Sequence, residues 1–174
     1  MRDRRFVAVH RGGLLDRESH AMLARWAADC AERVLPLFAR HSRDTRPAHA
    51  LAVLRAWAAG EAKTGVAIKA SLAAHAAARE SKYPAGVAAA RAAGQAASTA
   101  HCADHCMGAL LYALKAIAAD SRRINPYIKR QLGKLPAHLR EQVSSGLLAR
   151  LGTLKLASPT RGRVGEHPTA KSLA

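Results

Sequence analysis

Apolar residues recur along most of this chain at the three- and four-residue spacing of amphipathic helices. A first helix is predicted to begin near Asp16 or Ser19, since both residue types cap helix N-termini well. Pro36 should end or kink it, because proline removes a helical hydrogen bond and clashes with the preceding turn. At helical spacing this segment presents Leu23, Trp26, Ala27, Cys30 and Val34.

Two further helices are predicted before residue 84. The second follows Pro47, which suits a first helical position, and stops near Gly60. The third covers residues 65–82 and ends before the break at Tyr83-Pro84. Related spacing on the third helix groups Ile68, Leu72, His75, Ala76 and Arg79.

The second half of the chain starts with an alanine-rich run over residues 85–120. It is predicted to form one long helix or two helices that meet near Asp104. Pro136 can open a last helix that carries Leu139, Val143, Leu147 and Leu151 at helical spacing. The fold class expected is all-α: a single-domain antiparallel bundle of about five or six helices. Its parts are an N-terminal arm (1–14), a helical domain (15–154) and a disordered basic tail (155–174), rich in proline, glycine and charge.

Composition supports this prediction and excludes a membrane protein. Alanine occupies 41 of the 174 positions, while β-branched and aromatic residues are few. There is no sufficiently apolar run to span a bilayer and no signal-peptide core near the start, so a cytoplasmic protein is expected. In such a chain Cys30, Cys102 and Cys106 are expected to be reduced thiols, with Cys102 and Cys106 as small packing residues.

The formal net charge of +16 is concentrated in the C-terminal third. Residues 1–18 contribute +2, residues 19–120 contribute +5, and residues 121–174 contribute +9. This distribution favours contact between the C-terminal third and an acidic partner or nucleic acid. The alternative is a solvated, basic surface without a binding role.

His101 and His105 are weak metal candidates. Positions four apart on a helix point the same way, so the two imidazoles could share an ion. The motif HCADHC lacks the glutamate of HExxH metalloproteases. The alternative is a histidine pair that is largely buried against the first or third helix, and no metal or cofactor is assigned. A third ligand would have to come from Asp29, Cys30 or His75.

Three arginines interrupt apolar or alanine-rich stretches: Arg33, Arg79 and Arg91. If buried, each needs an acidic or carbonyl partner, and Asp29 lies four residues before Arg33. They are expected to form an internal polar network with Asp29 and Gln95 that fixes helix register, or else a basic pocket for an anion. The candidate binding or buried polar residues are therefore Trp26, Asp29, Arg33, His75, Arg79, Arg91, Gln95, His101 and His105.

Motifs for catalysis are missing from the sequence. It contains no glycine-rich phosphate loop, no GxSxG elbow, no kinase signature and no paired carboxylates placed for acid–base work, so an enzyme is not expected. The case for nucleic acid rests on charge alone, because no zinc finger or helix-turn-helix signature accompanies it.

Six segments form an ordered set of motifs along the chain: WAADCAERVLPLF, DTRP, RAWAAGE, AHAAAR, AARAAGQAASTAH and LPAHLREQVSSGL. Together they resemble the immunity-five-like family of bacterial immunity proteins. The resemblance covers roughly residues 16–150 and implies an all-helical, cytoplasmic protein that protects a bacterium by binding a polymorphic toxin. The family pattern is matched at Trp26, Asp29, Cys30, Arg33, Asp44, Arg46, Pro47, Trp57, Arg79, Arg91, Gln95, His101 and His105, whereas Cys102 and Cys106 do not belong to it.

The leading hypothesis is a non-enzymatic antitoxin whose partner is a cognate protein toxin, neutralised by stoichiometric binding. Two alternatives remain open. One is a nucleic-acid-associated helical protein that uses the basic C-terminal third, and the other is a small-ligand or metal-binding bundle.

Overall fold

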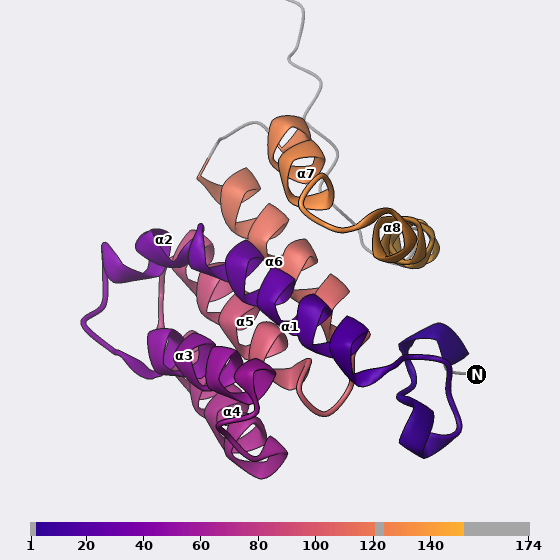
Figure 1. Ribbon diagram of the computed structural model, residues 1–174. Helices are drawn as coiled ribbons and strands as arrows, with labels where there is room; N and C mark the ends of the chain where they lie inside the picture. The colour runs from indigo at the N-terminus through magenta and orange to yellow at the C-terminus, as the bar shows by residue number, and fades with distance from the viewer. Residues whose placement is uncertain (1–2, 121–123, 152–174) are drawn as a thin grey trace, which may run out of the picture.

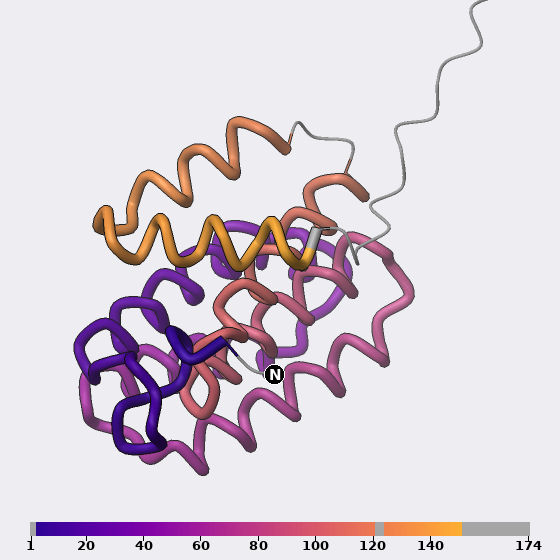
Figure 2. Tube along the Cα trace, turned by 90° about the vertical axis from the view of Figure 1, so that its right-hand side faces the viewer, coloured from indigo at the N-terminus to yellow at the C-terminus, as the bar shows by residue number. Residues whose placement is uncertain are grey.

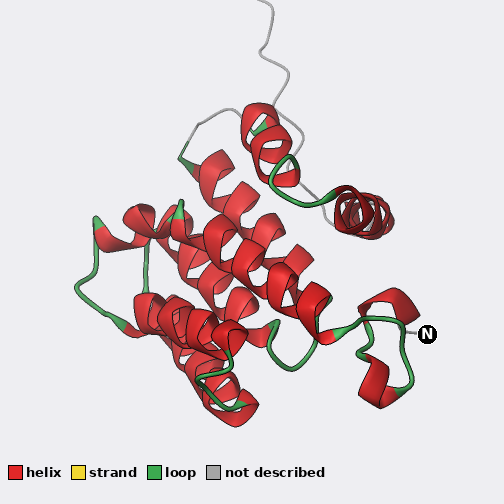
Figure 3. Ribbon diagram, in the orientation of Figure 1, coloured by secondary structure: helices red, strands yellow, loops and turns green. Residues whose placement is uncertain are grey.

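The computed structural model describes residues 3–120 and 124–151, and every regular element within them is helical (Figures 1 and 3). The elements in chain order are the 3-10 turns η1 (Arg4–Phe6) and η2 (Val9–Arg11) and the α-helices α1 (Arg17–Glu32), α2 (Leu35–Ala39), α3 (Arg46–Ala59), α4 (Thr64–Glu80), α5 (Pro84–Ser98), α6 (His105–Ala119), α7 (Asn125–Leu132) and α8 (Ala137–Leu151). The predicted all-α class is confirmed. The described chain has more helices than the five or six expected, because α2 and α7 are short separate segments. The predicted tail, 155–174, lies outside the described residues.

Local chemistry sets most helix ends. The Asp16 side chain accepts a hydrogen bond from the Ser19 amide at 2.7 Å and so caps α1. Pro36 lies in the first turn of α2, and α1 therefore ends before it, at Glu32. Gly60 ends α3 with a left-handed φ of 87°, a conformation that glycine adopts without steric penalty.

The alanine-rich run forms two helices, α5 and α6, joined by residues 99–104. Helix α5 lies at the centre of the bundle, where it contacts α1, α2, α3, α4 and α6. Its alanines Ala89, Ala93 and Ala96 are fully buried, and their small side chains let the neighbouring helices approach closely. Between α4 and α5, the buried hydroxyls of Ser71 and Ser98 lie 2.7 Å apart.

The C-terminal helices pack on the side of the bundle away from α4. Trp26 Nε1 donates to the Gln131 carbonyl at 2.8 Å, and the Tyr127 hydroxyl donates to the Cys30 carbonyl at 2.6 Å. These two hydrogen bonds hold α7 against α1. In both views α4 lies along the opposite edge from α7 and α8 (Figures 1 and 2). The outer side of α4 is therefore left uncovered by these two helices.

Candidate functional site

A single line of partly exposed side chains runs along the central helix. Between residues 86 and 98 of α5, Val87, Arg91 and Gln95 are half-buried, and all other residues are buried. Because these three positions are four residues apart, they lie on one stripe of the helix. This stripe is where α5 reaches the surface between α4 and α6.

Helices α4 and α6 flank that stripe with outward-facing residues of their own. On α4 the ring of His75 lies against α5, and on α6 the backbone at Gly108 lies under the Gln95 side chain. Helical spacing then places the other outward residues of each helix beside these two contacts. We call the resulting surface the α4–α6 face: Ile68, Leu72, His75 and Arg79 of α4, Val87, Arg91 and Gln95 of α5, and His105, Gly108, Tyr112 and Lys115 of α6.

His75 marks the join between α4 and α5. A Cβ at Gly94 would lie 2.7 Å from His75 Cε1, so the imidazole requires glycine opposite it. Its Nδ1 is buried and has no hydrogen-bond partner in the described part of the chain. Burial lowers the pKa of His75, and the charges of Arg91 and Arg79 lower it further. The imidazole is therefore held neutral next to two guanidinium groups.

Gln95 and His105 belong to the second half of the face, and His101 lies next to His105. The Nδ1 of His105 lies 2.8 Å from Gln95 Oε1, and the rings of His101 and His105 are 5.2 Å apart. Both imidazoles are half-buried, and the hydrogen bond of His105 goes to α5. The expected partner was the first or third helix, whereas the hydrogen bond of His105 goes to Gln95 of α5. They lie at a join near the surface, where α5 turns into α6.

Neither Arg79 nor Arg91 makes a side-chain hydrogen bond or an ion pair within residues 3–120 and 124–151. The acidic side chains close to the face in sequence are engaged elsewhere: Glu80 pairs with Arg46, Asp104 with Arg150, and Asp120 with Arg40. The outward stripes of α4, α5 and α6 themselves contain no carboxylate. The α4–α6 face is therefore basic.

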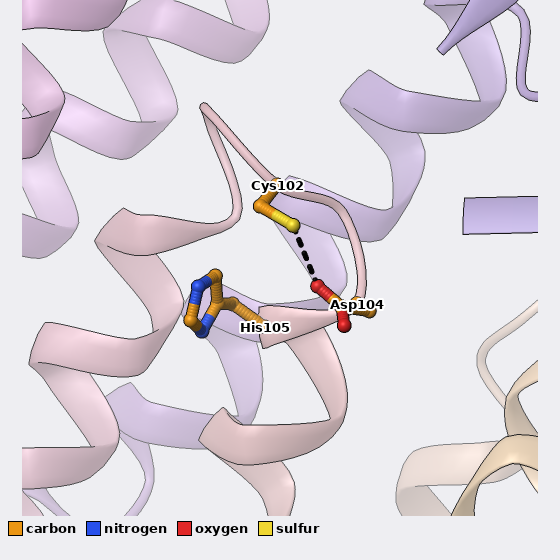
Figure 4. Close-up of side chains that lie close together, drawn as sticks. All are labelled: Cys102, Asp104 and His105. Carbon is orange, nitrogen blue, oxygen red and sulfur yellow. Dashed lines mark hydrogen bonds between the residues drawn. The ribbon is translucent and has the colours of Figure 1, made fainter. Parts of the chain in front are cut away.

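One group of possible metal ligands lies at the edge of this face. Ligand atoms of Cys102, Asp104 and His105 lie within 4.8 Å of one another (Figure 4). However, the Cys102 thiol donates to Asp104 at 2.7 Å, and Arg150 of α8 forms an ion pair with the same carboxylate at 2.7 Å. Burial raises the pKa of Asp104, but these two contacts outweigh it and lower the pKa. A cation here would compete with Arg150, so the turn is better described as the attachment point of α8.

The three residues that the sequence offers as a third metal ligand lie away from this turn. Asp29 accepts hydrogen bonds from Arg55 at 2.8 Å and from Lys134 at 3.2 Å. Cys30 is buried in the core, where burial raises the pKa of its thiol. His75 packs on Gly94.

The internal network expected around Asp29 is not formed. Asp29 bonds residues from α3 and from the segment after α7, and Arg33 is exposed at the rim of a cleft of about 400 Å³ between α2 and α7. Trp26 is buried and bonds α7. The physical reason is the orientation of α1. Asp29 lies on the side of this helix that faces α3 and the segment after α7, and not on a side that faces α4 and α5. Six of the nine predicted residues, however, belong to the region from α4 to the start of α6: His75, Arg79, Arg91, Gln95, His101 and His105.

Sequence reasoning missed a second concave region, beside the N-terminal arm. A cleft of about 590 Å³ lies between η2, the start of α1 and the end of α3, and its lining includes His10, Arg17, His20 and Trp57. The His20 ring meets the Trp57 ring edge-on at 4.9 Å, and its Nε2 lies 2.6 Å from the Thr99 carbonyl oxygen. In the sequence, the one signal for this cleft is His20, a polar residue in the first turn of α1.

Comparison with known proteins identifies one family. A model of the family described as Imm-5 like putative immunity protein matches residues 13–138, and this range holds helices α1 to α7. No curated protein and no solved structure matches the chain. Among the described helices, none has the length and apolar character needed to cross a membrane. Because the match covers most of the chain, the protein belongs to the Imm-5 like immunity protein family.

Proposed function

We propose that this protein is an antitoxin that neutralises a cognate toxin of a bacterial polymorphic toxin system by stoichiometric binding. It would act in the cytoplasm, where the toxin reaches its target, and without catalysis. Family membership supports the immunity role. The toxin-binding surface we assign is the α4–α6 face.

The observation that carries this assignment is the polar stripe on an otherwise alanine-packed helix. Arg91 and Gln95 are the polar side chains that α5 brings to the surface, and buried alanines on the same helix hold them in place. Rigid presentation of side chains reduces the entropy lost on binding. Arginine and aromatic residues such as Tyr112 are typical of the side chains that dominate protein interfaces.

The nucleic-acid alternative receives less support from the described part of the C-terminal third. Lys134 pairs with Asp29, Arg150 pairs with Asp104, and Arg140 donates to the backbone carbonyls of the turn before α8. Three of the five described lysines and arginines after residue 120 are therefore engaged within the bundle, while Lys129 and Arg130 are exposed and make no ion pair with described residues. The remaining charge of residues 152–174 lies outside the described residues.

The proposed function is tested first on the genes that flank the gene for this chain, where we expect one that encodes a polymorphic toxin. The toxin domain of that protein is then co-expressed with this chain. We expect the chain to restore growth of a bacterial host that produces the toxin domain. We also expect the purified proteins to form a complex of one chain with one toxin domain, measured by light scattering after size-exclusion chromatography. Growth arrest that persists, with no complex detected, would overturn the proposal.

A further inference from the structure

Building on the proposed function, we infer that the α4–α6 face recognises an acidic segment of the toxin. A carboxylate side chain binds between His75, Arg79 and Arg91, and a neighbouring apolar side chain packs on Ile68 and Leu72. Family membership leaves the chemistry of the partner surface open.

The antiparallel register of α4 and α5 brings the three recognition residues together. Ser71 lies opposite Ser98, and His75 lies on Gly94. One turn beyond His75, Arg79 therefore reaches the level of Arg91. Besides burial, the charges of both arginines lower the pKa of His75.

This cluster lacks the counter-charge that its two arginines call for. Arg79 and Arg91 make no ion pair with any residue of the described chain, although two neighbouring guanidinium groups repel each other. A single incoming carboxylate can accept from both guanidinium groups, and arginine binds carboxylates with matched, two-pronged geometry.

An apolar strip continues from the cluster along α4. Leu72 is 63% exposed and Ile68 is 37% exposed, and both share the outward stripe of His75. In water, exposed leucine and isoleucine next to each other gain from contact with an apolar partner. A phosphate backbone offers charge but no apolar group to cover them, whereas a protein segment offers both. The face therefore fits an acidic, partly apolar protein surface.

The test is a matched pair of charge reversals, with binding to the toxin domain measured by isothermal titration calorimetry. One variant combines Arg79→Glu and Arg91→Glu. The control combines Arg43→Glu and Arg130→Glu, which changes the net charge equally at exposed arginines that make no ion pair with described residues. We expect the first variant to weaken binding more than about 100-fold, the scale for disrupted charge pairs in interfaces, and the control less than about threefold. Thermal melting confirms that each variant is folded, and Arg79→Gln with Arg91→Gln replaces the reversal if it does not fold.

Two outcomes would overturn the inference and leave the proposed function intact. One is equal weakening by both variants, which would mean that net charge alone attracts the toxin. The other is binding of short duplex DNA that depends on Arg79 and Arg91 while toxin binding does not. If the unaltered protein fails to bind the toxin domain at all, the proposed function fails instead.

Discussion

Replacing Trp26 with alanine is expected to lower the free energy of unfolding by about 3–5 kcal/mol, the usual cost of removing a buried tryptophan. The side chain is 4% exposed, and its indole N–H donates to the Gln131 carbonyl at 2.8 Å. The substitution would leave a cavity between α1 and α7 and an unpaired carbonyl. Urea denaturation followed by circular dichroism measures the change.

Trp26→Phe separates the two contributions. Phenylalanine keeps most of the apolar contact and loses only the hydrogen bond, so we expect a smaller decrease, of about 1–2 kcal/mol. If Trp26→Ala shifted the free energy of unfolding by less than about 1 kcal/mol, the placement of α7 on α1 would be wrong.

Replacing Leu110 with alanine is expected to cost about 2–5 kcal/mol of stability, because this α6 side chain is fully buried in the core. Leu72→Ala is the matched control. It makes the same chemical change at a side chain that is 63% exposed, and we expect it to alter stability by less than about 0.5 kcal/mol. The same denaturation experiment gives both values, and equal losses from the two variants would contradict the assigned orientation of α4.

Most helix boundaries could be predicted because they depend on local chemistry. A cap at Asp16, prolines that start helices and the left-handed Gly60 act over a few residues, and the sequence displays them directly. The alanine run was harder to divide. Its residues 99–104 leave the helix although alanine and histidine there fit a helical pattern, so spacing left one helix and two helices equally open.

The face was predicted in part, and the failures share one cause. Gln95 and His105 meet because their positions flank a short turn, which sequence order can indicate. Asp29 was assigned to Arg33 because they lie four residues apart in sequence, but its partners Arg55 and Lys134 come from distant segments. Helical spacing fixes neighbours within one helix and leaves open which helix packs on which side.

The stripe of Ile68 and Leu72 on α4 is another case in which helical spacing does not show which side of a helix faces the core. An apolar stripe usually marks the core side of a helix, but here the core side of α4 consists of small residues such as Ala67, Ala70 and Ala74. Close packing against α5 requires the small residues, and the larger apolar side chains are left on the outside. The exposure of Ile68 and Leu72 therefore follows from the close packing of α4 on α5.

Hydroxyl-radical footprinting of side chains, with and without the toxin domain, tests most directly whether the α4–α6 face binds the toxin. Leu72 on α4 and Leu148 on α8 are a matched pair, 63% and 73% exposed, and they lie on helices at opposite edges of the bundle (Figure 2). We expect complex formation to slow oxidation of Leu72 strongly and to leave Leu148 unchanged. Protection of Leu148 with unchanged oxidation of Leu72 would place the toxin on the other side of the bundle and contradict this account.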